Sequence, residues 1–262
     1  MRVSLIRARY HSVWEPLNLM YLSAYVKKYF TLEPLEISIY DGYFDDDDGI
    51  VQKCVNSDIV GLSGTTPQLS HMFILAKRIK TQNSRVKTVL GGFGPSLEPE
   101  KCLKNPFVDH VVVGEGEQAF LDILNGTRSK VVNKPPIEDI DSIPFPDREA
   151  VDLERYIALT KKEEGRRVTS VLASRGCPFN CTFCVEGEFG TIWGEILLTD
   201  QGIMWKSKKK LRVRSPQRVL EEMHEIKRRY TIEFFKFSDA EINHSRKSVS
   251  YTHLTLPTNR EV

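Results

Sequence analysis

Three cysteines in one short segment are the residues whose type and spacing most clearly indicate chemistry. Cys177, Cys181 and Cys184 lie within eight residues, at spacings of four and three. Three thiolates spaced in this way can turn around one metal centre, and thiolates are the usual ligands of iron–sulfur clusters. Three ligands for a four-iron cluster leave one iron without a protein donor, and that open iron can chelate a substrate. The segment therefore predicts a 4Fe–4S cluster with one open iron.

Structural zinc is the alternative interpretation of this segment. Zinc normally takes a fourth protein ligand in a closed tetrahedral site. His224 and His244 are the only histidines between the cysteines and the last fourteen residues, and neither has a paired zinc-finger spacing. A disulfide framework fits less well, because three of the five cysteines are packed together. Cys54 and Cys102 have no such spacing, and we expect them to be ordinary buried thiols.

Short apolar runs alternate with amphipathic segments five times over residues 1–125, and these elements precede the cysteines. The runs are short and rich in Val, Ile and Leu, as buried parallel strands are. The expected strands are Val3–Ile6, Leu35–Tyr40, Ile59–Leu62, Val86–Leu90 and Val111–Val113. Five strand–helix units in series predict a doubly wound, flavodoxin-like parallel sheet, with its ligand beyond the carboxyl ends of the strands.

The second half of the chain begins with a proline-rich segment, residues 131–165, which we interpret as an ordered linker. A strand starting at Val168 then runs into the cysteine segment. A helix is expected over Pro216–Tyr230, with Ser215 as its N-cap and proline at its first position. Phe234–Phe237 is the next expected strand. Strand, loop, helix and strand are the opening of a β/α barrel.

Composition and charge exclude several classes of protein. The chain has 262 residues, of which 40% are hydrophobic and 27% charged, and a formal net charge of +2. This charge is too small to favour nucleic acid or an anionic membrane surface as a partner. No run approaches the roughly 20 apolar residues that span a bilayer, and the first residues do not resemble a signal peptide. We therefore expect a cytoplasmic protein with no nucleic-acid partner and no membrane span.

The cysteine segment, RGCPFNCTFC, resembles the CxxxCxΦC signature of the radical S-adenosylmethionine superfamily, with Phe183 as the aromatic residue Φ. The resemblance implies that the three cysteines hold the cluster and that S-adenosylmethionine chelates the fourth iron. Reduction of the cluster then cleaves S-adenosylmethionine to a 5′-deoxyadenosyl radical, which takes a hydrogen atom from a small-molecule substrate. It also implies an electron donor such as a flavodoxin or a ferredoxin. Plain loop packing is the alternative interpretation of Phe183.

Five pieces of the chain resemble, in order, the cobalamin-binding domain and linker of one branch of that superfamily. They are PLNLMYLSAY at 16–25, DIVGLSG at 58–64, VLGG at 89–92, VGEGE at 113–117 and IPFPD at 143–147. The resemblance implies cobalamin as a further cofactor. The Asp-x-His-x-x-Gly motif of the mutases is absent, because Asp109-His110 and Gly114 have the wrong spacing. No histidine from such a motif is therefore expected on the cobalt. The tRNA methylthiotransferases fit less well, because they need three further cysteines.

The residues expected to contact the cobalamin lie where strands end, because a flat macrocycle or its nucleotide tail needs close backbone approach there. They are Ser63, Gly64, Thr65, Gly91, Gly92, Gly114, Glu115 and Gly116. Glycines also end strands in α/β folds that bind no ligand. Acidic residues such as Glu115 are equally favoured by the positive end of the next helix. Asp239, at the end of a strand, has two interpretations, a ligand contact or a turn cap.

The whole chain is interpreted as a cobalamin-binding α/β domain over 1–130, the linker over 131–165 and the beginning of a radical S-adenosylmethionine β/α (partial TIM-like) barrel over 166–248. The branch implies methyl transfer to an unactivated centre as the first hypothesis for function. A cobalamin-dependent cyclase or rearrangement enzyme is the second. A corrinoid-binding or metal-binding module without chemistry of its own is the third. The catalytic residues and the substrate are not indicated by the sequence.

The last fourteen residues, 249–262, follow neither a helical nor a strand period. Their first ten, VSYTHLTLPT, resemble translated adapter sequence from transposase-based libraries, and a C-terminal strand is the alternative. Because a radical S-adenosylmethionine barrel has about six strand–helix units, we expect the chain to be a truncated piece that does not itself cleave S-adenosylmethionine.

Overall fold

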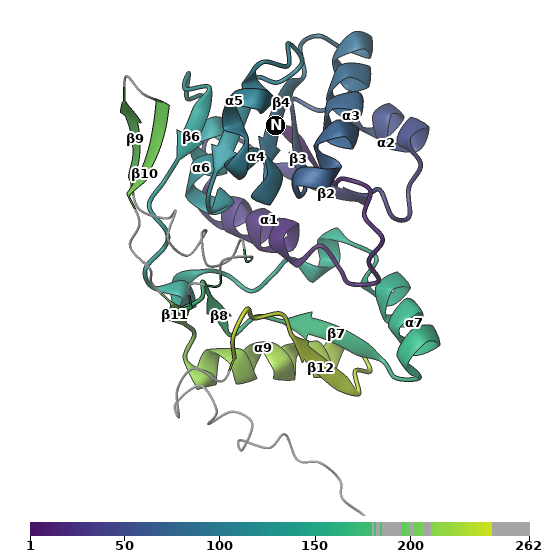
Figure 1. The fold of residues 1–262 in the computed structure, drawn as a ribbon. Helices are drawn as coiled ribbons and strands as arrows, with labels where there is room; N and C mark the ends of the chain where they lie inside the picture. Colours follow the sequence, from purple (N-terminus) through teal and green to yellow (C-terminus); the bar gives the residue numbers. More distant parts are fainter. Residues whose placement is uncertain (180, 182–183, 185–194, 200–201, 207–210, 243–262) are drawn as a thin grey trace, which may run out of the picture. The chain divides into compact units, whose positions relative to one another are not determined.

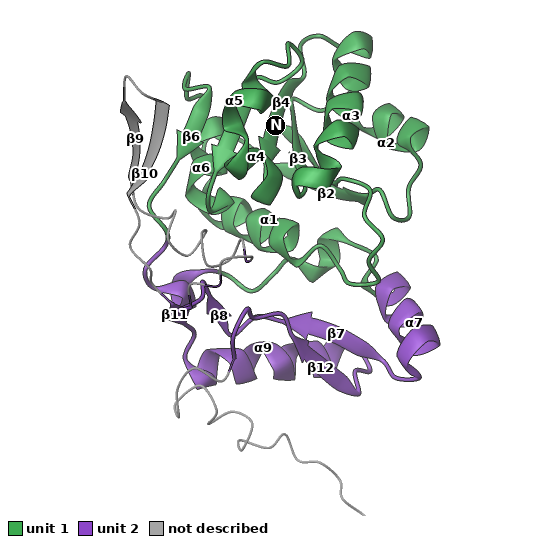
Figure 2. Cartoon of the chain, viewed as in Figure 1, with its two compact units in different colours: residues 1–136, 144–153 green, residues 137–143, 154–262 purple. Residues whose placement is uncertain are grey.

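The computed structural model describes residues 1–179, 181, 184, 195–199, 202–206 and 211–242. The chain divides into two compact units (Figure 2). The first unit contains residues 1–136 and 144–153, and the second contains 137–143 and the residues from 154 onward. The chain therefore passes between the units three times.

A six-stranded parallel sheet is the centre of the first unit, in the order β2-β1-β3-β4-β5-β6 (Figure 1). Its strands are β1 Arg2–Arg7, β2 Glu36–Asp41, β3 Ile59–Ser63, β4 Lys87–Gly91, β5 His110–Val113 and β6 Val131–Asn133. β1 pairs with both β2 and β3, and Leu5 lies opposite Ile39 on one side and Gly61 on the other. The first five strands confirm the expected flavodoxin-like α/β sheet, in which the strand order reverses at β1.

Helices flank this sheet and supply the other half of its core. They are α1 Leu17–Tyr29, α2 Asp47–Cys54, α3 Leu69–Gln82, α4 Phe93–Leu97, α5 Pro99–Leu103 and α6 Gly116–Leu124. α1 lies beside α6 and α2 beside α3, on opposite faces of the sheet (Figure 1). The strands and helices bury Leu5, Ile6, Leu62, Leu75, Ile79, Leu90 and Phe120 almost completely. This continuous apolar core fixes where the loops at the carboxyl ends of the strands can lie.

Strand β6 and helix α7, Leu153–Glu164, are among the elements that were not predicted from the sequence. β6 is only three residues long and lies at the edge of the sheet, where Val131 pairs with Val111. Helix α7 begins within the segment interpreted as a linker. Its buried residues Tyr156, Ile157 and Thr160 do have helical spacing. The prolines before it made the whole segment look irregular, although they end before the helix starts.

The segment between the units is ordered by specific hydrogen bonds within the first unit. It contains two 3₁₀ turns, Ile140–Ser142 and Arg148–Ala150. The Asp147 amide donates to the Met20 carbonyl at 3.0 Å. The Asp147 carboxylate accepts from Ser23 Oγ and Lys27 Nζ, each at 2.6 Å. Helix α1 therefore holds Asp147. We call the segment around it, residues 144–153, the linker clasp.

The second unit contains a parallel pair of strands, β7 Val168–Val171 and β12 Phe234–Phe237. Helix α9, Pro216–Arg229, comes before β12 in the chain, and Ser215 Oγ accepts from the Arg218 amide at 3.2 Å as its N-cap. This confirms the expected strand, helix and strand; the complete barrel stays a prediction. Two antiparallel pairs are also present, β8 Ser174–Arg175 with β11 Arg212–Val213 and β9 Glu195–Thr199 with β10 Gly202–Lys206. Over the ranges that the structure describes, no helix is long and apolar enough to cross a membrane.

Candidate functional site

The cysteine segment follows β7 and β8 in the second unit. Gly176, with φ +87°, turns the chain directly before Cys177, a conformation that favours glycine. Cys177 is buried, Cys181 is exposed and Cys184 is intermediate. The Cys184 amide donates to the Cys181 carbonyl at 3.0 Å. Phe183, the expected aromatic neighbour of the cofactor, lies outside the described residues.

The donor set in this segment fits an iron–sulfur cluster in its chemistry. All three cysteines are free thiols, and they follow the carboxyl end of a parallel strand, where β/α folds place their active sites. The structure does not bring the three together as a ligand cage. Among the residues it describes, no three His, Cys, Asp or Glu side chains lie close enough to hold a metal ion.

The other two cysteines are buried in the first unit. Cys54 in α2 and Cys102 in α5 both have no exposed surface. Burial raises the pKa of each thiol to about 11. This confirms the expectation that they are ordinary buried thiols, unsuited to act as nucleophiles or ligands at neutral pH.

Hydrogen bonds join the loops after β3, β4 and β5, and these loops carry the residues expected to contact cobalamin. The Gly64 amide donates to the Gly91 carbonyl at 3.3 Å, and the Gly94 amide donates to the Gly64 carbonyl at 3.0 Å. Ser96 Oγ donates to the Gly92 carbonyl at 2.7 Å and accepts from the Gly114 amide at 3.1 Å. The structure therefore brings the expected residues of three separate loops together at one edge of the sheet.

The glycines of these loops do not all have the same role. Gly92 has φ +91°, and a Cβ built there would lie 2.8 Å from the Gly64 carbonyl oxygen. A Cβ at Gly64 would lie 2.9 Å from the Met72 sulfur. By contrast, Gly91 and Gly116 have no neighbour closer than 3.7 and 3.5 Å, respectively, to an added Cβ. Gly92 therefore permits close packing of the loop after β4 on the loop after β3, and Gly64 permits close packing on α3, whereas a Cβ at Gly91 or Gly116 would make only ordinary van der Waals contact with Val112 or Leu22.

Polar side chains at this edge already have partners in the protein. Ser63 Oγ accepts from Asn18 Nδ2 at 2.9 Å. The Thr65 amide donates to Gln68 Oε1 at 2.8 Å, which caps the short turn before α3. Glu115 is buried at the N-terminus of α6, where the helix dipole favours a negative charge.

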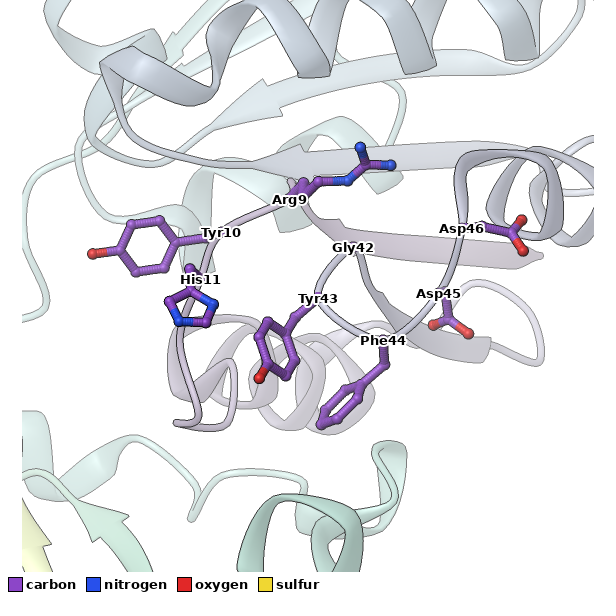
Figure 3. Close-up of a pocket in the computed structure, with 8 residues that line it drawn as sticks. All are labelled: Arg9, Tyr10, His11, Gly42, Tyr43, Phe44, Asp45 and Asp46. Atoms are coloured by element: carbon purple, nitrogen blue, oxygen red, sulfur yellow. The ribbon is translucent and has the colours of Figure 1, made fainter. Parts of the chain in front are cut away.

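A cavity of about 450 Å³ lies at the carboxyl ends of β1 and β2, and the sequence analysis did not identify it (Figure 3). It is lined by Arg9, Tyr10, His11, Gly42, Tyr43, Phe44, Asp45 and Asp46. The Tyr43 ring lies 5.8 Å from the His11 ring and 4.9 Å from the Phe44 ring, centroid to centroid. The sequence does contain a signal for this cavity. Aromatic and charged residues are concentrated directly after two strands, where α/β folds bind ligands.

One wall of this cavity is anchored by a charged network. The Arg9 guanidinium contacts Asp47 Oδ1 at 2.6 Å, and the Arg9 amide donates to His71 Nδ1 at 2.9 Å. His71 Nε2 lies 2.9 Å from Asp47 Oδ1. Burial raises the pKa of Asp47, but the hydrogen bond from His71 and the positive charges of Arg9 and Arg78 outweigh this effect, so the pKa lies below its usual range.

The first unit matches a known domain family. Residues 3–124 match the model of the B12 binding domain. That match spans β1 to α6 and includes the carboxyl ends of β1, β2, β3, β4 and β5.

The chain is also similar to named enzymes. An uncharacterized methyltransferase of Pyrococcus horikoshii is 31% identical over 252 residues, which cover 86% of this chain and 48% of the relative. The anaerobic magnesium-protoporphyrin IX monomethyl ester cyclase of Rubrivivax gelatinosus is 29% identical, covering 94% of this chain and 46% of the relative. The cytidylyl-2-hydroxyethylphosphonate methyltransferase of Streptomyces wedmorensis is 27% identical, covering 87% of this chain and 51% of the relative.

These similarities extend beyond the first unit, because each covers more than four-fifths of the chain. The chain spans about half the length of these curated relatives. The relatives include both methyltransferases and a cyclase. The chain therefore carries a B12 binding domain over residues 3–124 and is similar, over most of its length, to proteins named as methyltransferases and as a cyclase.

Proposed function

We propose that this chain is the cofactor-binding part of an enzyme that reductively cleaves S-adenosylmethionine and transfers a methyl group to an unactivated centre of a small molecule. The observation that carries the proposal is the pairing of two features in one chain. A B12 binding domain precedes a loop of three free cysteines at the end of a parallel strand. The named methyltransferases among its relatives support methyl transfer.

In this proposal Cys177, Cys181 and Cys184 bind three irons of a 4Fe–4S cluster, and Phe183 lies beside it. Cys177 is buried, whereas Cys181 is exposed. When bound, the cluster supplies the electron that cleaves S-adenosylmethionine, and the cobalamin carries the methyl group. The protein's part is to hold the thiolates in place and limit water around the cluster.

The cobalamin contacts are assigned to the hydrogen-bonded loops at the edge of the sheet. Gly91 and Gly116 are assigned to the close approach of the corrin or its tail, because a glycine lets a ligand come near the backbone. Ser63, Gly64, Thr65, Gly92, Gly114 and Glu115 complete the proposed contact set. An electron donor such as a flavodoxin or a ferredoxin and a cytoplasmic location belong to the same proposal.

Cyclisation is the second candidate, because the relative from Rubrivivax gelatinosus is named as a cyclase and matches 94% of this chain. Product analysis with the full-length gene product separates the two reactions. Methyl transfer consumes two molecules of S-adenosylmethionine for each product, one as the methyl source and one as the radical source. A product without a new methyl group would favour the cyclase.

The cluster is tested by anaerobic reconstitution and iron analysis of this chain. We expect about four irons and four sulfides per chain, lost on replacing Cys177, Cys181 or Cys184 by alanine. Cys54→Ala and Cys102→Ala are the matched controls, since both thiols are buried in the other unit. A full cluster in the Cys181→Ala protein would refute the cluster assignment.

The cobalamin is tested by electron spin resonance of its cobalt(II) form bound to this chain. We expect no nitrogen splitting from a protein ligand, because the mutase motif is absent. We also expect Gly91→Val to weaken cobalamin binding, because a branched side chain would hinder the close approach of the corrin or its tail to that backbone. No measurable binding by the wild-type chain would refute cobalamin as a cofactor. Non-catalytic binding would appear as cofactors held without reductive cleavage of S-adenosylmethionine by the full-length protein.

A further inference from the structure

The three residues Leu172–Ser174 lead from the end of β7 into β8, which precedes the turn at Gly176, and we call them the stem. Ala173 and Ser174 are almost completely buried. Ala173 packs against Val219 of α9, with Met223 and Phe237 around it. A buried stem needs a partner for each of its backbone polar groups.

The end of strand β12 satisfies one side of the stem. Both carboxylate oxygens of Asp239 lie 3.1 Å from the Ala173 amide, and Oδ1 accepts from Ser174 Oγ at 2.5 Å. One residue earlier, the Ser238 amide donates to the Val171 carbonyl at 2.9 Å. The Asp239 carboxylate therefore takes the place that the next backbone carbonyl of β12 would have in the ladder.

A buried ion pair satisfies the other side of the stem. Arg214 Nη1 donates to the Leu172 carbonyl at 2.7 Å, and the Arg214 amide donates to the Ala173 carbonyl at 2.8 Å. The same Nη1 contacts Glu222 Oε2 of α9 at 2.6 Å. The side chains of Arg214 and Glu222 are only 5% and 1% exposed. A paired, buried guanidinium has little freedom to leave the stem.

We infer that Asp239 and Arg214 are positioning residues that hold the stem from its two sides and so fix where Cys177 enters the cysteine segment. Cys177 is three residues beyond Ser174 and is the only buried member of the three cysteines. Hydrogen bonds to charged groups are the stronger ones in a buried site. The consequence for a cluster rests on the proposed function, whereas the effect on Cys177 itself does not. The turn-cap interpretation of Asp239 is the one that these contacts favour.

The first test needs no cluster. The apoprotein is treated with iodoacetamide under reducing, anaerobic conditions, and the alkylation of each cysteine is followed by mass spectrometry. In the wild type we expect Cys181 to react fastest and Cys177 slowest of the three. Asp239→Asn should speed alkylation of Cys177 about tenfold, because a charge-assisted hydrogen bond to a buried group is lost. Cys54 and Cys102 should stay unreactive and so report that the first unit remains folded.

Two further variants protect the test against simple unfolding of the second unit. Ser174→Ala removes one hydrogen bond to Asp239 and keeps the carboxylate. We expect it to speed the alkylation of Cys177 by a few-fold. Glu221→Gln changes an exposed carboxylate that pairs with Arg218 on the same helix, and it should change nothing. Unchanged alkylation of Cys177 in both Asp239→Asn and Ser174→Ala would overturn the inference. Should Asp239→Asn unfold the unit, Ser174→Ala decides it.

The second test uses the reconstituted protein. Asp239→Asn should lose iron to a chelator about tenfold faster than the wild type and alter the spin-resonance spectrum of the reduced cluster, whereas Glu221→Gln should do neither. A wild-type chain that forms no cluster would refute the proposed function, while the alkylation test would still decide the role of the stem. A stable wild-type cluster with unaffected iron loss and unaffected alkylation in Asp239→Asn would refute only the positioning role.

Discussion

Replacing Gly92 by alanine should destabilise the first unit by about 3 kcal/mol. Gly92 has φ +91° and ψ −170°, a region that almost only glycine occupies, so another residue there costs at least about 1 kcal/mol in backbone strain. The new Cβ would also lie 2.8 Å from the Gly64 carbonyl oxygen and 2.9 Å from Ser63 Oγ. Relieving that overlap requires a backbone shift, which costs about 2 kcal/mol. The population of opened molecules should therefore rise about a hundredfold, since 1.4 kcal/mol is a factor of ten.

Alanine substitutions at two other glycines distinguish the cost of backbone strain from the cost of steric overlap. Gly126 has φ +88° but no atom within 4 Å of an added Cβ, so Gly126→Ala should cost only the strain, about 1 kcal/mol. Gly91 has neither a positive φ nor a close neighbour, so Gly91→Ala should change the free energy of unfolding by less than about 0.5 kcal/mol.

The assay is the reactivity of Cys54 and Cys102 at increasing urea concentrations. Both thiols are buried, and their raised pKa keeps them protonated at pH 8 in the folded protein, whereas unfolded cysteines react readily. The reaction therefore reports opening of the first unit and not of the second. Equal midpoints for Gly92→Ala and Gly126→Ala would refute the argument that close packing against Gly64 sets the larger cost.

Three further predictions concern other contacts. Ser215→Ala should destabilise α9 by about 1 kcal/mol because the Arg218 amide loses its cap, and Ser215→Asp should retain the stability in urea titrations followed by circular dichroism. Glu15→Gln should destabilise the first unit by about 2 kcal/mol, because it removes the buried carboxylate that lies 3.4 Å from the buried Arg148 guanidinium; an unchanged urea midpoint would contradict this. Burial raises the pKa of Cys54 to about 11, so the protonated thiol contributes fully to stability below pH 9, and this contribution is lost as the pH rises towards about 11. The free energy of unfolding of the first unit should therefore fall less steeply between pH 9 and 11 in Cys54→Ala than in the wild type.

The first five strands of the first unit could be predicted because their apolar runs are long enough to be recognised from the local sequence, without knowledge of the strands they pair with. β1, β3 and β4 each carry three or more buried residues in succession, which is typical of central parallel strands. The three residues of β6 carry no such signal, and their pairing depends on β5 being already in place. Helix α7 was missed because the prolines before it dominated the interpretation of the whole segment.

The candidate site was predictable where local spacing decides the chemistry and not where distant contacts decide it. The cysteine spacing indicates a metal ligand set without any knowledge of the fold. Asp239, by contrast, contacts residues more than 60 positions earlier in the chain, so its two interpretations could not be separated from the sequence. The cavity at β1 and β2 also joins two segments, Arg9–His11 and Gly42–Asp46, that only the sheet brings together.

The three crossings between the two units have a consequence for fragmentation of the chain. A single cut between residues 137 and 143 leaves the linker clasp on the C-terminal fragment, although its partners Ser23 and Lys27 are on the N-terminal one. A single cut after residue 153 leaves Asp141 on the N-terminal fragment, although it accepts from the Ser215 amide of the second unit at 3.0 Å. Either nick should therefore give two fragments that complement each other without a covalent bond and migrate together in a native gel. Nicking at both sites would be needed before the halves could separate as independent pieces.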